Sequence, residues 1–162
     1  MIAVAQRAAR AEVRVDGAVV GAIGPGLMIL LGVDREDGPA DVEWMAAKCA
    51  NLRIFPDQDR LMNRSVLETG GAALVVSQFT LLGDARRGRR PGFERAAPPG
   101  MAERLYLEFC GRLAALGVPV QSGQFRAHME VELVNDGPVT LLLDSREGRR
   151  AEPAGGSAGA PA

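Results

Sequence analysis

The segment Leu27-Met28-Ile29-Leu30-Leu31-Gly32-Val33 is apolar along its whole length and follows the turn signal Gly24-Pro25-Gly26. A short run that is apolar at consecutive positions is typical of a strand covered on both faces. We therefore expect residues 27–33 to form a central strand, around which the rest of the fold is built.

The residues before this segment predict a hairpin. Residues 2–8 have the pattern of a first strand, and the valines around Asp16-Gly17 alternate as in two strands joined by a tight turn. After the central strand, the apolar run 72–76 follows the Gly70-Gly71 turn and predicts another strand. Shorter strands are expected at residues 52–55, 129–133 and 139–144.

Two helices are expected. Pro39 suits a first helical turn, and apolar residues recur at spacings of three and four through residues 39–51. A similar stripe over residues 101–116 predicts the second helix, which Gly117 ends. Residues 82–100 hold four glycines and three prolines, so they predict a long loop of the kind that usually has a function.

These elements predict a mixed α/β fold with seven or eight strands and two helices. A chain of 162 residues is long enough for one domain with its own core, and we assign this domain to residues 1–148. Residues 149–162 form a tail rich in Ala, Gly and Pro. Such a tail buries too little apolar area to offset the entropy of ordering it, so we expect it to be disordered.

Composition limits the function classes. The formal net charge of −1 argues against a protein that coats nucleic acid by general attraction, although Arg86-Arg87-Gly88-Arg89-Arg90 offers a local basic loop. No apolar run approaches the ~20 residues of a membrane span, and no signal peptide is apparent, so we expect a soluble, cytoplasmic protein. The two cysteines, Cys49 and Cys110, are interpreted as core residues.

Several mechanisms are disfavoured by the residue types. His128 is the single histidine, and its place beside a predicted strand makes a structural role the simpler interpretation. No His, Cys and carboxylate cluster has the spacing of metal ligands, so no metal is expected. The turn Gly24-Pro25-Gly26 precedes a strand and not a helix, which is the wrong context for a nucleotide loop, and no cofactor is expected.

Two polar motifs remain. The motif Ser77-Gln78-Phe79-Thr80-Leu81 follows the strand 72–76 directly, where backbone N–H groups could stabilise an oxyanion and Phe79 could stack on a base. The simpler alternative is ordinary alternation in a strand, with Phe79 in the core. The motif Asn135-Asp136-Gly137-Pro138-Val139-Thr140 lies between two predicted strands, and the turn of a hairpin would explain it.

With four further segments, these motifs resemble the D-aminoacyl-tRNA deacylase family over roughly residues 1–145. The further segments are Ile2-Ala3-Val4-Ala5-Gln6-Arg7, Asn51-Leu52-Arg53-Ile54-Phe55, Arg89-Arg90-Pro91 and Ala96-Ala97-Pro98-Pro99. The resemblance implies a barrel-like sheet that pairs as a homodimer, with tRNA as its partner. It also implies hydrolysis of the ester that joins a D-amino acid, or glycine, to the terminal adenosine of tRNA. A non-catalytic RNA-binding or adaptor dimer with the same fold is the alternative.

The resemblance also assigns site residues. The terminal adenosine and the ester would be held by the catalytic residues Ser77, Gln78, Phe79 and Thr80. A ribose hydroxyl of the substrate lies next to the scissile carbonyl and would assist the reaction, so few catalytic side chains are needed. The residues implied to contact or shape the substrate are Arg7, Phe79, Met129, Gly137 and Pro138.

The Gly137-Pro138 step has a special place in this resemblance. In the family this peptide is cis and enters the active site of the partner subunit, where it excludes an L side chain, and Arg7 corresponds to an arginine that braces the loop. The sequence departs from the family pattern at Gly92, where serine is common, and at Arg126 and His128, which stand in place of small and acidic residues before Met129.

Overall fold

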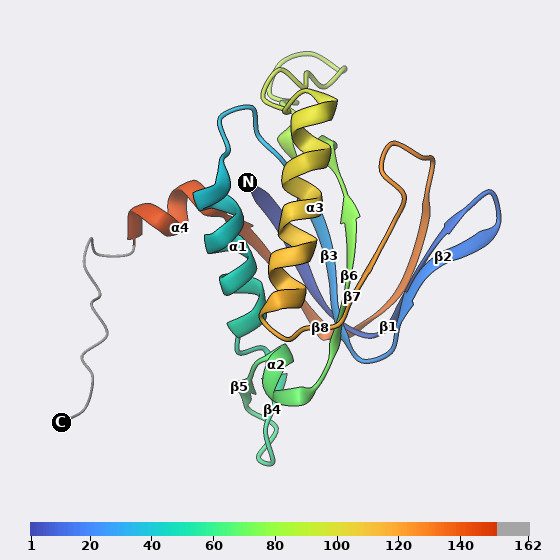
Figure 1. Cartoon of the computed structure of the whole chain (residues 1–162), viewed down its shortest axis with the longest axis vertical. Coiled ribbons are helices and arrows are strands. Elements are labelled where there is room, and N and C mark those ends of the chain that lie inside the picture. Colours follow the sequence, from blue (N-terminus) through green and yellow to red (C-terminus); the bar gives the residue numbers. More distant parts are fainter. Residues whose placement is uncertain (152–162) are drawn as a thin grey trace.

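Strand β3 (Gly26–Gly32) lies in the middle of the main sheet, as its sequence predicted (Figure 1). Strand β1 (Ile2–Val15) runs antiparallel to it on one side, and β6 (Ala72–Ser77) runs parallel to it on the other. Ile29 packs into the large core beneath the helices, whereas Met28 packs into a second cluster made mostly of strand residues. Both faces of β3 are therefore buried.

The computed structural model describes residues 1–151, and its main sheet nearly closes into a barrel. The strand order is β2-β1-β3-β6-β7, with β2 at Ala18–Ile23 and β7 at Val120–Ser122, and the two end strands contact each other. Strand β8 (Glu130–Asp144) pairs with β1 and leaves the path of the barrel. The hairpin between β1 and β2 turns at Asp16-Gly17, as predicted, and both turn residues have positive φ.

Four α-helices lie within residues 1–151, so the prediction of two was incomplete. Helices α1 (Pro39–Asn51) and α3 (Pro99–Ala115) correspond to the two predicted helices and lie together over one face of the sheet (Figure 1). The unpredicted helices are α2 (Val66–Thr69), which is only one turn long, and α4 (Ser145–Ala151). Neither has the apolar periodicity from which a helix can be recognised.

Two predicted strand regions differ in the structure. The strand predicted at 52–55 is replaced by a small separate hairpin of β4 (Phe55–Pro56) and β5 (Met62–Arg64). The strands predicted at 129–133 and 139–144 are parts of β8, which pairs with β1 on both sides of an irregularity in register. The hairpin interpretation of Asn135–Thr140 is therefore wrong, because both halves of β8 have the same partner.

Helix α4 is fixed by buried charges at the start of the chain. The Met1 ammonium group lies 2.5 Å from an Asp37 carboxylate oxygen and 2.8 Å from the Ser145 hydroxyl, which in turn donates to Asp41. Arg149 also pairs with Asp41 at 3.1 Å. Helix α4 thus runs three residues past the boundary predicted at residue 148. The predicted tail from residue 152 onward lies outside the described residues.

Candidate active site at the end of strand β6

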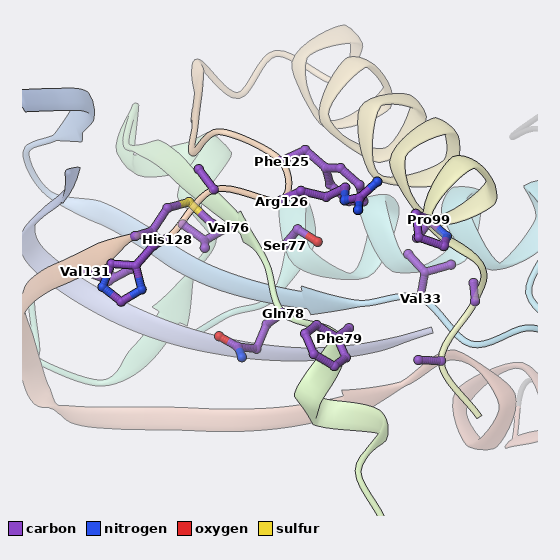
Figure 2. A pocket seen from close by; sticks show the side chains of 15 residues that line it. Val33, Val76, Ser77, Gln78, Phe79, Pro99, Phe125, Arg126, His128 and Val131 are labelled. Atoms are coloured by element: carbon purple, nitrogen blue, oxygen red, sulfur yellow. The ribbon is translucent and has the colours of Figure 1, made fainter. Parts of the chain in front are cut away.

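A cavity of about 520 Å³ opens where β6 ends (Figure 2). Its lining includes Ser77, Gln78 and Phe79 from the predicted motif, and Met129 from the segment before β8. The structure therefore brings four of the predicted site residues together. Ala96, Ala97 and Pro99, from the segment that enters α3, also line the cavity.

A tight turn positions the motif. Ser77 pairs with Leu31 of β3, and the next residue, Gln78, donates its backbone N–H to the Leu31 carbonyl at 2.8 Å. The chain then forms the 3-10 helix η1 (Phe79–Leu82), which crosses close over the end of β3. At Gly32 an added Cβ would lie 2.9 Å from the Gln78 carbonyl oxygen, so only glycine lets η1 approach this closely.

Phe79 is 56% exposed, so the prediction that alternation could place it in the core is wrong. The strand ends at Ser77, and the 3-10 turn directs Phe79 away from the core. Its ring contacts Phe93 edge to face, with 5.1 Å between the centroids. An exposed aromatic face at the wall of a cavity is a surface on which a nucleobase can stack.

Thr80 is exposed and does not line the cavity. Its hydroxyl accepts a hydrogen bond from the Gln78 side-chain amide. Phe79 and Thr80 begin η1, whose first N–H groups have no acceptor within the turn, and Gln78 places no side-chain cap on them. This arrangement offers backbone donors for a developing negative charge, but no activated hydroxyl.

Within residues 1–151, no carboxylate lines the cavity. The ionisable residues of this lining are Arg126 and His128, and no hydrogen bond of the described residues joins His128 to Ser77 or Thr80. His128 is exposed and lines the cavity, which corrects its interpretation as a structural histidine. A nucleophile paired with a general base is therefore missing from the described lining.

The opposite wall is held by the core. Phe125 lines the cavity and packs on Tyr106 of α3, with ring centroids 6.0 Å apart. The Tyr106 hydroxyl is buried and donates to the Val75 carbonyl of β6 at 2.8 Å. Sequence reasoning missed Phe125 as a wall residue, because it belongs to an irregular segment without periodicity. The buried tyrosine joins α3, β6 and this wall into one rigid frame.

Arg7, Gly137 and Pro138 lie away from this cavity. The Arg7 guanidinium donates to the Asp136 carbonyl at 3.1 Å and to the Ile54 carbonyl at 2.6 Å, and it pairs with the Asp136 carboxylate. Gly137 and Pro138 are exposed, and the peptide between them is cis. Arg7 thus contacts the loop in the way that the family resemblance implied.

The sheet register separates this loop from the cavity of the same chain. Ser77 is opposite Leu31, Leu31 is opposite Ala3, and Ala3 is opposite Leu143. Pro138 lies five residues before Leu143 on β8. With strands ~4.8 Å apart and ~3.3 Å per residue, these steps of about 14 Å across the strands and about 17 Å along β8 separate Ser77 from Pro138 by roughly 20 Å within the sheet.

The arginine-rich loop is attached to the cavity through Phe93. Asp84 and Gly92 exchange backbone hydrogen bonds of 2.8 and 2.9 Å at the base of the loop. Arg86 pairs with the Asp84 carboxylate at 2.5 Å and holds the pKa of that carboxyl well below its usual range. The exposed arginines at the tip, Arg87, Arg89 and Arg90, have no ion pair within residues 1–151.

The side chains and helices of residues 1–151 also bear on metal binding and on membrane insertion. No three or more His, Cys, Asp or Glu side chains within residues 1–151 are grouped so that they could hold a metal ion. None of the helices in this part of the chain is both long enough and apolar enough to cross a membrane. The buried Cys49 packs in the large core, and burial raises the pKa of its thiol to about 12.

Known proteins resemble the chain over nearly its whole described length. Residues 4–144 match the family model described as D-Tyr-tRNA(Tyr) deacylase. The D-aminoacyl-tRNA deacylase of Symbiobacterium thermophilum is 61% identical over 145 residues, which are 90% of this chain and 96% of that protein. The protein of the same name from Anaeromyxobacter dehalogenans is 64% identical over 146 residues, 90% of this chain and 98% of that protein. A solved structure named c-Myc DNA Unwinding Element Binding Protein has a TM-score of 0.84 and 40% identity, covering 89% of this chain and 98% of that one.

Proposed function

The chain belongs to the D-Tyr-tRNA(Tyr) deacylase family of aminoacyl-tRNA hydrolases, and from this membership we propose what its cavity does. The cavity binds the terminal adenosine of a D-aminoacyl-tRNA and hydrolyses the ester that joins the amino acid to the ribose. The observation that carries the proposal is a cavity that Ser77, Gln78 and Phe79 line where β6 ends, and whose described lining has no carboxylate. Charged tRNA is a cytoplasmic substrate, so we place the activity in the cytoplasm.

The chemistry suits a site without a nucleophile and base pair. Water attacks the ester carbonyl, the backbone N–H groups of Phe79 and Thr80 stabilise the oxyanion, and the ribose oxygen leaves with a proton. The neighbouring ribose hydroxyl of the substrate assists proton transfer, which replaces a protein base. Phe79 stacks on the adenine, and the Gln78 and Thr80 side chains hold each other at the start of the turn.

Chirality is decided by the Gly137-Pro138 loop of a second copy of the chain. Within one chain the loop is roughly 20 Å along the sheet from Ser77, so it reaches a cavity only across a subunit interface. Among the described strands, β8 pairs with β1 alone, and it exposes four apolar side chains, which supports pairing of two copies. These side chains are Val131, Val134, Leu141 and Leu142.

Selection in this site works by exclusion. A rigid loop next to the α-carbon clashes with an L side chain, while a D side chain points away from it. Glycine has no side chain to clash, so glycyl-tRNA is also a substrate. No metal or cofactor takes part in this mechanism.

The direct test is hydrolysis of D-tyrosyl-tRNA, L-tyrosyl-tRNA and glycyl-tRNA by the purified protein. We expect release of D-tyrosine and glycine, and sparing of the L ester. Release of L-tyrosine at the rate of D-tyrosine would contradict the exclusion mechanism, and no release from any of the three would contradict the deacylase function.

A second test asks whether the loop acts on the partner's cavity. Gln78→Ala damages the cavity, and Gly137→Ala damages the loop, because its added Cβ would lie 2.9 Å from the Arg7 guanidinium. Heterodimers of the two variants, isolated with two affinity tags, contain one site with both defects and one intact site. They should have about half of wild-type activity, while each variant homodimer has little. Heterodimers as inactive as the homodimers would show that the loop acts within its own subunit.

The alternative is a non-catalytic nucleic-acid-binding dimer with this fold. It is favoured by the exposed arginines at 87–90 and by the name of the solved structure that is 40% identical to this chain. The test is to replace Arg87, Arg89 and Arg90 by Gln and to measure tRNA binding at several salt concentrations. The slope of the logarithm of the binding constant against the logarithm of the salt concentration should decrease in magnitude by about one for each phosphate that the arginines no longer neutralise. Tight RNA binding without any ester hydrolysis would favour this alternative.

A further inference from the structure

One cation at the cavity has no role in the proposed chemistry. Arg126 lines the cavity between Phe125 and Ala127 and is exposed. Figure 2 shows the nitrogen-bearing end of its side chain beside Phe125, on the side of the cavity where Pro99 lies, with His128 at the other end near Val131. No carboxylate within the described chain forms an ion pair with the Arg126 guanidinium.

The backbone at this position is one that arginine adopts poorly. Arg126 is the third residue of the turn 124–127, which the Ala127 N–H closes by donating to the Gln124 carbonyl at 3.2 Å. Its φ is +63°, and a turn that requires positive φ at this position usually has glycine or asparagine there. Neither packing nor an ion pair explains the arginine, because its side chain is exposed and has no carboxylate partner among the described residues. Because Arg126, unlike the similarly strained Arg60, lines the cavity, a contact with a ligand would explain it.

The charge of the cavity indicates which part of a substrate this contact takes. The described lining has one permanent cation, Arg126, and no carboxylate, so the part of a ligand that lies beside Arg126 is expected to be an anion. The terminal nucleotide of an aminoacyl-tRNA has one anion, the phosphodiester at the 5′ position of its ribose. A guanidinium binds such a group through two parallel hydrogen bonds.

We propose that Arg126 binds the 5′-phosphate of the terminal adenosine and so positions the nucleotide whose 3′ end carries the ester. The proposal rests on the proposed function, because it takes the end of tRNA as the ligand of the cavity. Arg126 is then a positioning residue, which adds affinity for the nucleotide and takes no part in the proton transfers.

The test compares two ligands that differ only in this phosphate. They are the non-hydrolysable 3′-amide analogues of D-tyrosyl-adenosine with and without a 5′-phosphate, titrated calorimetrically into the full-length protein. Wild type should bind the phosphorylated analogue about tenfold more tightly, equivalent to ~1.4 kcal/mol. Arg126→Gly should reduce this preference to less than about twofold and leave the affinity for the other analogue unchanged.

Arg126→Gly also separates a ligand role from a structural one. Glycine relieves the positive φ, so the melting temperature should stay the same or rise while the phosphate preference is lost. The matched control is Arg60→Gly, because Arg60 is also exposed, has a φ of +62° and lies outside the cavity. This control should keep the full preference for the phosphorylated analogue.

Three results would overturn the proposal. They are an equal affinity of wild type for the two analogues, an unchanged preference in Arg126→Gly, and an equal loss of affinity for both analogues in that variant. Failure of the proposed function gives a different result, in which the wild type prefers the phosphorylated analogue but hydrolyses no D-tyrosyl-tRNA. That result would support the phosphate contact of Arg126 and contradict the proposed hydrolysis.

Discussion

Gly32→Ala should damage the proposed site more than it damages the fold. The added Cβ would lie 2.5 Å from a methyl group of Leu82, 3.1 Å from the Leu81 Cβ and 2.9 Å from the Gln78 carbonyl oxygen. The Leu82 side chain can rotate away. The Gln78 carbonyl belongs to the backbone that begins η1, so relief of that contact moves the turn itself.

The size of the effect follows from these distances. An ordinary contact needs about 3.4 Å, so the Gln78 carbonyl has to move by roughly 0.5 Å, and overpacking of this kind typically costs ~1–3 kcal/mol of folding stability. The same movement displaces the N–H groups of Phe79 and Thr80 from the position of the oxyanion. Because misplacement by ~1 Å can reduce a rate about 100-fold, we expect kcat/KM on D-tyrosyl-tRNA to fall by about 10- to 100-fold.

The measurement combines urea denaturation with steady-state deacylation. The control is Gly24→Ala, since an added Cβ there meets nothing within 4 Å and the residue precedes the same strand. The control should keep both stability and rate. A Gly32→Ala protein with wild-type kcat/KM would refute the view that the position of η1 on β3 determines the activity.

Four further predictions follow from the site and the core. Phe79→Ala should raise KM by a factor equivalent to ~1–3 kcal/mol with little change in stability, because an exposed stacking surface is lost; an unchanged KM would count against stacking. Thr80→Ala should reduce kcat about tenfold without abolishing it, whereas an acyl group trapped on Thr80 and detected by mass spectrometry would indicate covalent catalysis. Burial raises the pKa of Asp34, but a backbone amide hydrogen bond and the contacts with Arg95 and Arg146 lower this pKa by more. The ionised Asp34 should therefore stabilise the fold above its ordinary pKa of 3.8, and this contribution should be lost as the pH falls further. The melting temperature of Asp34→Asn should then decrease less on acidification than that of wild type. Overnight dialysis against EDTA should leave the deacylation rate unchanged, and a loss that added metal restores would contradict the mechanism.

The parts of the fold that periodicity describes could be predicted from the sequence. Strand β3 and helices α1 and α3 each have an apolar pattern because each buries a defined face in the large core. Helix α4 has no such pattern. The Ser145 hydroxyl donates to the Asp41 carboxylate and Arg149 forms an ion pair with it, and these contacts hold helix α4 in place. Both residues lie more than 100 positions from Asp41 in the sequence. No local pattern contains that information.

For the site, the sequence predicted the place in the fold but not the orientation of the side chains. The motif Ser77–Thr80 indicated the strand end, but not that η1 would expose Phe79 and turn Thr80 out of the cavity lining, because this depends on the close approach of Gly32. His128 was interpreted as structural, since one residue gives no sign of whether it precedes or enters a strand. Its place in the cavity lining depends on the path of the irregular segment before β8, which no local pattern contains.

Arg7 explains how β8 can carry an exposed loop inside a paired strand. The register between β1 and β8 shifts on both sides of Ala8. Between Ile2 and Ala8, Arg7 is the one residue whose backbone has no residue opposite it on β8. A protruding loop removes ladder hydrogen bonds and would leave carbonyl groups unsatisfied. The Arg7 guanidinium donates to the carbonyls of Asp136 and Ile54 and is only 11% exposed, so it replaces those bonds from within the gap. Two carbonyls in different directions require the fork of a guanidinium, which a lysine ammonium on its flexible stem does not supply. The same side chain therefore accounts both for the protrusion of the Gly137-Pro138 loop and for the stiffness that the proposed exclusion of an L side chain would demand.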